Sequence, residues 1–280
     1  GPRPVKRITH PLLVIPQFWG QSPRKSDKDP KMKKLIAALL LTTTPAFALD
    51  LGAMTDAEKD QFGTAVRAYL MENPQVLIEA MTELEQRRIA DEAKNDSAMI
   101  AQLQSEIYED GHSWVGGNPD GDLTVVEFID YRCGVCRQVF PHVEETVAND
   151  GNIKVIFKDL PILGQESDLA ARFAVAVKQN EGDEAYKKVH DHFYTMRGNV
   201  TVEGLKATAE EMGFDADKVI TAMNSDAVTD VLRENAQLAD ALQIAGTPSF
   251  IIGDTLMRGM PQTGIAPVIE QARAKAKSDG

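Results

Sequence analysis

Two cysteines, Cys133 and Cys136, are the residues of this 280-residue chain best suited to covalent chemistry. They are its only cysteines, and they occur as Tyr-Arg-Cys-Gly-Val-Cys-Arg directly after the apolar run Leu123–Ile129. A Cys-x-x-Cys pair after a buried strand starts a helix with its first sulfur at the helix N-terminus. There the free N–H groups and aligned peptide dipoles favour a thiolate, the nucleophile of disulfide exchange. The spacing therefore predicts a redox-active dithiol.

The two thiols should have different roles. We expect Cys133 to be the exposed attacking thiol and to ionise at a lower pH than a free cysteine. Cys136 should then resolve the mixed disulfide. An incidental pair, a structural disulfide and half of a zinc site are the alternatives. Structural zinc needs four ligands, and no other cysteine exists to supply them.

Residues 32–48 have the pattern of a secretory signal peptide. They combine the basic start Met-Lys-Lys, a short apolar stretch and an Ala-x-Ala site at Ala46 and Ala48. The apolar stretch is too short to span a bilayer as a helix. We therefore expect a mature chain that begins near Leu49 and is exported to the periplasm of a Gram-negative bacterium, where disulfides persist. Residues 1–31 read as a mis-assigned start or an added cloning sequence.

The charge of the chain changes at this boundary. Residues 1–48 hold nine of the 30 basic and two of the 42 acidic side chains, which leaves 21 and 40 and a formal charge of −19 for the rest. Such an acidic protein is a poor ligand for nucleic acid. The remaining length suits one catalytic domain with an appendage.

Residues 49–111 are predicted to form a helical arm for oligomerisation. Apolar residues recur at helical spacing on both sides of Pro74: Phe62, Val66 and Tyr69, then Leu77, Met81 and Leu84, and later Ile100, Leu103 and Ile107. A helix running from Gln75 past Ile107 would be longer than a small domain can cover, at 1.5 Å per residue. Its apolar positions should pack either on a second copy of the chain or back on its own domain. The polar stretch Arg87–Asn95 could be a hinge.

Residues 112–280 are predicted to form an α/β domain. The domain opens with Ser113-Trp114-Val115, and strands are expected at 123–129, 152–158, 249–252 and 255–258. Between them, helices are expected at 133–149, 169–178, 184–196, 201–212, 216–223 and 227–244, with a last helix at 265–276. The long helical run at about 165–245 is an insertion between two strands of one sheet.

Three motifs together resemble the DsbA family of thioredoxin-fold proteins. They are Glu127-Phe-Ile-Asp-Tyr-Arg-Cys-Gly-Val-Cys136, the helical insert, and Gly246-Thr-Pro-Ser-Phe250. The resemblance covers roughly Ser113 to the C-terminus. The arm sequences Tyr69-Leu-Met-Glu-Asn-Pro-Gln-Val-Leu77 and Glu85-Gln-Arg-Arg88 are most similar to the ScsC branch, the suppressor-of-copper-sensitivity proteins. The resemblance implies a thioredoxin fold with an inserted helical subdomain, an arm that trimerises the protein, disulfide isomerase activity, and Cu(I) binding at Cys133 and Cys136.

Thr247 and Pro248 match the cis-proline loop that faces the dithiol in thioredoxin folds. A cis bond would present the backbone of Thr247 to an extended substrate, so that recognition ignores side-chain identity. Thr247 in place of a β-branched aliphatic residue favours isomerase-like relatives. An ordinary trans turn before a strand is the alternative interpretation.

Glu127 lies six residues before Cys133, where the family has an acid beneath the active site. Burial would raise the pKa of this carboxyl and let it exchange a proton with Cys136. Otherwise it is a solvated strand residue, because strands alternate faces. Lys158 on the next strand is a possible charge partner.

The histidines carry less information. His190 and His192 are two residues apart and so cannot share one side of a helix. These two, with His112 and His142, are expected to be ordinary surface or packing residues.

Three functional hypotheses follow. The first is a trimeric disulfide isomerase and reductase that repairs misoxidised exported proteins and is kept reduced by a membrane-bound DsbD/ScsB-like reductase. The second is a monomeric disulfide oxidase whose arm packs on its own domain. The third is a copper chaperone without enzymatic activity, since adjacent thiolates are soft ligands suited to Cu(I). No other cofactor is expected.

Overall fold

The computed structural model of the chain describes residues 54–279. The expected upstream segment, the signal peptide and the first residues of the arm lie outside this range. The chain divides into two units, residues 1–65 and 66–280. Only residues 54–65 of the first unit are described, and they include the start of helix α1 (Asp56–Glu72). Within residues 54–279, no helix is long and apolar enough to cross a membrane.

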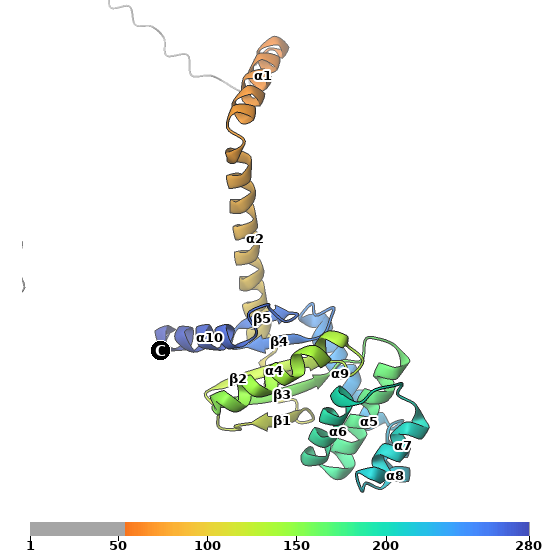
Figure 1. Cartoon of the computed structure of the whole chain (residues 1–280). Coiled ribbons are helices and arrows are strands. Elements are labelled where there is room, and N and C mark those ends of the chain that lie inside the picture. Colours follow the sequence, from red (N-terminus) through yellow and green to blue (C-terminus); the bar gives the residue numbers. More distant parts are fainter. Residues whose placement is uncertain (1–53, 280) are drawn as a thin grey trace, which may run out of the picture. The chain divides into compact units, whose positions relative to one another are not determined.

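A five-stranded sheet forms the centre of the second unit (Figure 1). Its strands are β1 (Trp114–Gly117), β2 (Leu123–Ile129), β3 (Ile153–Asp159), β4 (Ser249–Ile252) and β5 (Thr255–Arg258). They lie in the order β1-β3-β2-β4-β5, with β2 and β3 parallel and the other pairs antiparallel. Four of the five strands were expected from the sequence, and β1 was not.

Helix α4 (Gly134–Asp150) connects the parallel strands β2 and β3, and five helices are inserted between β3 and β4. The inserted helices are α5 (Gln165–Glu181), α6 (Asp183–Thr195), α7 (Val202–Glu211), α8 (Ala216–Ala222) and α9 (Asp226–Ala241), and α10 (Ala266–Asp279) follows β5. This is the thioredoxin fold with an inserted helical subdomain. The predicted α/β fold class is confirmed.

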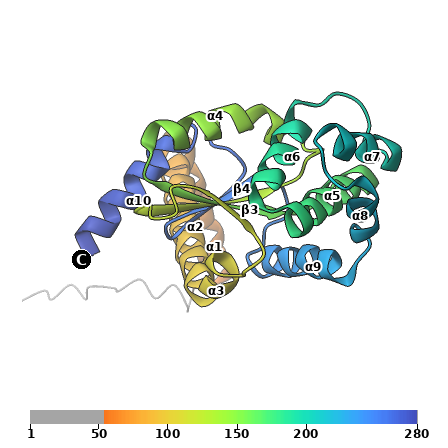
Figure 2. The ribbon, with the colours of Figure 1, turned by 90° about the horizontal axis from the view of Figure 1, so that it is seen from below.

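Side-chain alternation along the strands gives the sheet two different buried faces. Figure 2 shows the sheet between α4 on one side and α3 (Gln104–Tyr108) on the other. The dithiol face carries the odd-numbered residues of β2 and β3, such as Val125, and packs on α4 and α6. The opposite face carries Val126 and Ile156 and packs on the end of the arm and α9.

Helix α2 (Gln75–Gln102) runs without a break through the polar stretch Arg87–Asn95. Ion pairs along its surface join Arg87 to Glu83, and Arg88 to Glu85 and Glu92. Pairs three or four residues apart support a continuous helix. The expected hinge at this stretch is therefore wrong. The break comes later, at Leu103, where the backbone leaves helical geometry before α3 begins.

The last part of the arm folds onto its own domain. Ile100 and Ile107 are 4% and 0% exposed and belong to the core of the opposite face. Asp96 accepts two hydrogen bonds from Arg258 of β5, at 2.8 and 2.9 Å. We call residues 96–112 the arm root. Of the two arrangements that the sequence left open, packing on the same chain holds for this segment.

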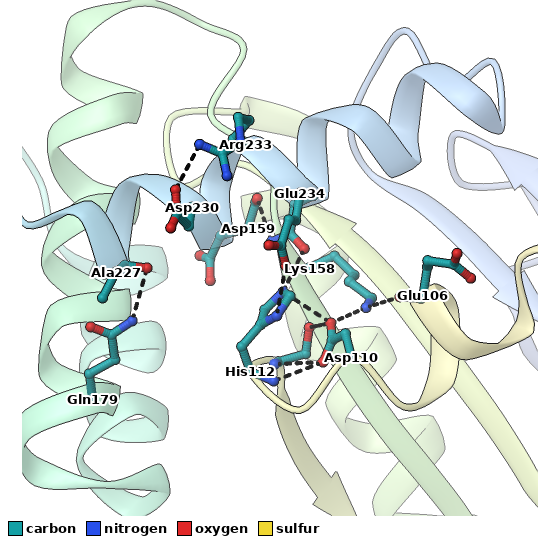
Figure 3. A network of polar contacts seen from close by, with 12 residues as sticks. Glu106, Asp110, His112, Lys158, Asp159, Gln179, Ala227, Asp230, Arg233 and Glu234 are labelled. Carbon is teal, nitrogen blue, oxygen red and sulfur yellow. Dashed lines mark hydrogen bonds and ion pairs between the residues drawn. The ribbon is translucent and has the colours of Figure 1, made fainter.

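Lys158 anchors the arm root from inside the sheet (Figure 3). Its side chain is fully buried, and its Nζ donates to the Asp110 carboxylate and, at 2.7 Å, to the Glu106 carbonyl. The suggested pairing of Lys158 with Glu127 is wrong. Glu127 lies opposite Phe157 in the parallel register, so Lys158 projects from the other face of the sheet.

His112 joins the same network and is more than an ordinary surface residue. Its ring nitrogens lie 3.1 Å from Asp110 and 3.5 Å from Glu234. It also contacts Asn235, whose amide donates to the Asp159 carbonyl at 3.0 Å. Figure 3 shows how this cluster ties the arm root, β3 and α9 together.

We expect Asp110→Asn to lower the free energy of unfolding by about 3 kcal/mol, because it removes the charged partner of a buried ammonium group. Urea denaturation at neutral pH measures this loss. Adding Lys158→Met should recover much of it, since no buried charge is then left unpaired. The matched control is Glu109→Gln, which alters an exposed acid next in sequence. Equal losses in Asp110→Asn and Glu109→Gln would contradict the anchoring role of Lys158.

Candidate active site around the dithiol

Cys133 occupies the N-cap position of α4. Its backbone is extended, with φ −72° and ψ 116°, and its Sγ accepts a hydrogen bond from the backbone N–H of Cys136 at 3.4 Å. The helix dipole and free N–H groups at this position favour negative charge on the sulfur. Cys133 is 7% exposed and Cys136 1%. The expectation of an exposed attacking thiol is thus wrong in degree, although Cys133 remains the more accessible sulfur.

The loop before β4 covers the Cys133 side chain. The Thr247–Pro248 peptide bond is cis, as the motif predicted. The thiol of Cys133 donates to the Thr247 carbonyl, with the sulfur 3.1 Å from the oxygen. The nucleophile therefore faces a backbone acceptor that an extended peptide could also use.

Cys136 lies one helical turn further along α4, inside the core. Burial raises the pKa of this thiol, and interactions with the Asp130 backbone and the Thr247 side chain offset only part of the effect. A thiol in this position needs a proton acceptor before it can attack.

Glu127 is the buried acid beneath the dithiol. It is 5% exposed and lies on the dithiol face between Phe157 of β3 and Phe250 of β4. Burial, with a smaller contribution from Glu144, raises its pKa to about 8. The expectation of a buried carboxyl that titrates near neutrality is confirmed.

Asp130 fixes the turn that leads from β2 into the dithiol, and sequence reasoning missed it. One carboxylate oxygen accepts from the Arg132 N–H at 2.8 Å and the Ser167 hydroxyl at 2.7 Å. The other accepts from the N–H groups of Ile162 and Leu163. Its position between the strand and the Cys-x-x-Cys motif was the available signal. Asp residues commonly bind nearby backbone N–H groups in turns.

A second missed feature is a stripe of polar aromatic residues on the buried face of α6. Tyr186, His190 and Tyr194 are spaced by four residues, so they share one side of the helix, which packs over the dithiol face. The sequence analysis considered only the two-residue separation of His190 and His192, and so it missed the four-residue spacing of His190 from the two tyrosines. His190 is buried and stacks on Phe157 with ring centroids 4.3 Å apart.

A groove of about 550 Å³ runs beside the dithiol, between α4 and the loop 260–266. Val135, half exposed, lines one end, and His142 lies along its length. Met260 and Pro261 form the facing wall. The mixture of apolar and polar groups suits an extended peptide that reaches Cys133.

The dithiol holds both cysteine sulfurs of the described structure, and these are soft metal ligands. Within residues 54–279, no group of three or more His, Cys, Asp or Glu side chains is arranged to hold a metal ion. A metal ion at the dithiol would therefore have the sulfurs of Cys133 and Cys136 as its ligands from this chain. Two thiolates fit Cu(I), which prefers soft ligands and low coordination numbers.

Comparison with known proteins agrees with this geometry. The DSBA-like thioredoxin domain family matches residues 124–264, which is half of the chain, and the copper resistance protein ScsC N-terminal domain matches residues 58–90. A thioredoxin-like oxidoreductase from Silicibacter pomeroyi is 34% identical, with a TM-score of 0.55; the match covers 62% of this chain and 97% of that one. Proteus mirabilis ScsC in a compact conformation is 26% identical, with a TM-score of 0.52, covering 71% of this chain and 98% of that one.

Among curated relatives, the probable disulfide bond formation protein D of Bacillus anthracis is 25% identical over 50% of this chain and 69% of its own length. The Na(+)/H(+) antiporter NhaA 1 of Salinispora arenicola is 27% identical, but the chain spans only 21% of that protein. The chain belongs to the DsbA-like thioredoxin domain family, and its N-terminal arm is of the ScsC type. It is a thiol-disulfide oxidoreductase of the DsbA/ScsC class.

We expect Glu127→Gln to stabilise the protein at alkaline pH. The folded protein holds the Glu127 proton up to about pH 8, whereas the unfolded chain releases it near the ordinary value of 4.5. The wild type therefore loses stability as pH rises between these values, on the order of 5 kcal/mol in total. Glutamine stays neutral, so the variant should keep that stability.

Urea denaturation at pH 5 and pH 9 tests this expectation. The two proteins should differ little at pH 5 and most at pH 9. Glu145→Gln, at an exposed position on α4, is the matched control and should follow the wild type at both pH values. A constant difference between Glu127→Gln and the wild type would show that the carboxyl does not titrate in this range.

Proposed function

We propose that this oxidoreductase is a disulfide isomerase and reductase for exported proteins. The observation that carries the proposal is the position of the Cys133 sulfur, at a helix N-cap and 3.1 Å from the Thr247 carbonyl. A thiolate beside the backbone of the Thr247 loop can attack the disulfides of many polypeptides, because main-chain hydrogen bonds do not select side chains.

The cycle begins when the Cys133 thiolate attacks a substrate disulfide. A mixed disulfide forms, and one substrate thiolate leaves and takes up a proton. In isomerisation, another substrate thiol attacks the mixed disulfide and frees Cys133. In reduction, Cys136 gives its proton to Glu127 in the ionised form of that carboxyl, its sulfur bonds to that of Cys133, and the second substrate thiolate leaves. The enzyme dithiol is then oxidised, and the substrate disulfide is reduced by two electrons.

The arm supports a second part of the proposal, assembly into a homotrimer. Phe62, Val66 and Tyr69 on α1 are 39–57% exposed, and Leu77, Met81 and Leu84 on α2 are 50–69% exposed. Each set is spaced three or four residues apart and forms an apolar stripe on one side of its helix. The segment carrying them is the one that the ScsC N-terminal domain matches. Burial against other copies of the chain would remove these stripes from water.

The proposed setting is the periplasm, reached by means of the signal peptide at residues 32–48. There the substrates would be misoxidised or unfolded exported proteins, and a membrane-bound reductase would return the dithiol to the reduced state. An isomerase needs this partner because only the reduced dithiol can attack a substrate disulfide.

Cu(I) binding at Cys133 and Cys136, with a role in copper tolerance, completes the proposal. Its support is the pair of adjacent soft sulfur ligands and the copper resistance domain to which the arm is similar. The metal would be cargo of the dithiol, since the exchange cycle needs no cofactor.

A monomeric disulfide oxidase is the competing function. The arm root favours it, because Ile100 and Ile107 are already buried on the same chain. The exposed stripes of α1 and α2 favour the trimer. The resting redox state of the dithiol separates the two, since an oxidase must rest as the disulfide.

Met81→Lys combined with Leu84→Lys should separate assembly from thiol chemistry. Both side chains are more than 65% exposed, so the fold should tolerate the changes. We expect a monomer by light scattering, repair of scrambled ribonuclease reduced about tenfold, and unchanged alkylation of Cys133, because linked active sites act at a high effective concentration.

The matched control places the same charges on the other side of α2, as Thr82→Lys with Gln86→Lys. It should remain trimeric and active. Truncation at Gly111 would also remove Asp110, the ion-pair partner of Lys158. Substitutions in the arm avoid this loss. Equal repair by both double variants would refute a role for the arm in isomerisation.

We expect Cys136→Ser to weaken Cu(I) binding at least tenfold, because it removes one of two thiolate ligands. Competition with a chromophoric Cu(I) chelator under reducing conditions measures the affinity. Met71→Leu is the control, since it removes an exposed soft thioether remote from the dithiol motif in sequence. Unchanged affinity in Cys136→Ser would show that copper binds elsewhere.

A further inference from the structure

The polar stripe of α6 contains a buried hydroxyl that packing alone leaves unused. Tyr194 is 4% exposed, and its hydroxyl has no hydrogen-bond partner among the described residues. A buried polar group without a partner costs free energy, which a phenylalanine in its place would avoid. The hydroxyl therefore calls for an explanation other than filling the core.

The other members of the cluster are bonded to one another. Tyr186 donates to the Asp159 carboxylate at 2.9 Å, and the Tyr131 hydroxyl lies 3.3 Å from that of Tyr186. The Tyr131 hydroxyl also lies 3.4 Å from Nδ1 of His190. The rings of His190 and Tyr194 meet edge to face, with centroids 4.8 Å apart. Tyr194 thus ends a chain of polar groups that begins at Asp159.

The end of α6 that carries Tyr194 is fastened to the first turn of α4. Arg137, the residue after Cys136, donates to the carbonyls of Phe193 and Met196 at 3.3 and 3.0 Å. These two carbonyls flank Tyr194 in the chain. The tyrosine is thereby held over the dithiol face, where Cys136 projects from α4 and Glu127 from β2.

The electrostatic surroundings of Tyr194 agree with this placement. Burial contributes most to raising the pKa of its hydroxyl. The negative charges that Cys136 and Glu127 would carry raise this pKa further, and those of Tyr186 and Asp159 contribute less. The hydroxyl therefore stays protonated and can only donate to an anion beside it. Tyr194 packs on Phe140, one helical turn after Cys136 on α4, with ring centroids 5.0 Å apart. The resolving thiol and its proton acceptor are the two charged groups that raise the pKa of Tyr194 most.

We propose that Tyr194 is a positioning residue of the resolving step, whose hydroxyl donates a hydrogen bond to the Cys136 sulfur as negative charge passes to it from Glu127. Before the step Glu127 is in its ionised form, and the Tyr194 hydroxyl has no partner among the described residues. When Cys136 transfers its proton to that carboxylate, the charge moves to sulfur, which bonds to Cys133 as the substrate thiolate leaves. The hydroxyl keeps its own proton throughout. This inference rests on the roles proposed above for Cys133, Cys136 and Glu127.

The test uses the full mature chain, reduced and mixed with excess dithiobis(nitrobenzoate). Cys133 attacks this aromatic disulfide and releases one coloured thiolate. Cys136 then resolves the mixed disulfide and releases a second, so the protein dithiol is oxidised while the reagent is reduced. Stopped-flow absorbance separates the two phases, and Cys136→Ala, which should show the first phase alone, assigns them.

We expect Tyr194→Phe to slow the second phase about tenfold at neutral pH, as loss of a hydrogen bond to a charged group implies. The first phase should not change. The pH midpoint of the second phase should rise by about one unit, because the Cys136 thiolate loses its donor. Thermal stability should be unchanged or higher, since an unpartnered polar group has been removed.

Tyr108→Phe is the matched control. It removes a tyrosine hydroxyl that donates to the Gly253 carbonyl at the arm root, and both phases should match the wild type. A wild-type second phase and pH profile in Tyr194→Phe would overturn the proposal, and so would an equal slowing of both phases, which would indicate a distorted site. A wild type that shows both phases but repairs no scrambled ribonuclease would refute the isomerase and leave the role of Tyr194 standing.

Discussion

Alternation of side chains along the central parallel strands is the constraint on which the rest of the structure depends. Consecutive residues of β2 and β3 point to opposite faces, so Glu127 and Lys158 are buried on different sides of the same sheet. Each buried group avoids an unpaired charge in a different way. Glu127 takes up a proton beneath the dithiol, whereas Lys158 is paired with Asp110 of the arm root. One face of the sheet thereby serves the chemistry and the other holds the arm.

The arm root and the dithiol are therefore stabilised by contacts on opposite faces of the sheet. Contacts of the arm root are made with β5, α9 and the face that carries Lys158, and the dithiol lies on the other side of the sheet. Changes in the arm before Asp96 therefore leave the core around Cys133 intact.

The sequence predicted the fold well because its signals were local. The strands follow apolar runs, and the dithiol and Thr247–Pro248 follow from short motifs. What it missed depends on register and on long-range packing. The partner of Lys158 could not be found without knowing that Glu127 lies opposite Phe157. The burial of Cys133 depends on a loop more than 100 residues later in the chain, whose Thr247 carbonyl covers the sulfur.

Two buried acids on the dithiol face explain how a well-packed core can supply protons. Burial raises the pKa of Asp159 to about 7 and that of Glu127 to about 8. Both therefore exchange protons near neutrality, where a solvated carboxyl would be fully ionised. Tyr186 donates a hydrogen bond to Asp159, and the charge of Glu127 contributes to raising the pKa of the same tyrosine. A fold selected for stability alone would fill these positions with apolar groups. Both acids lie on the face of the sheet that carries the dithiol, where a group able to exchange protons near neutrality supports the resolving step proposed above.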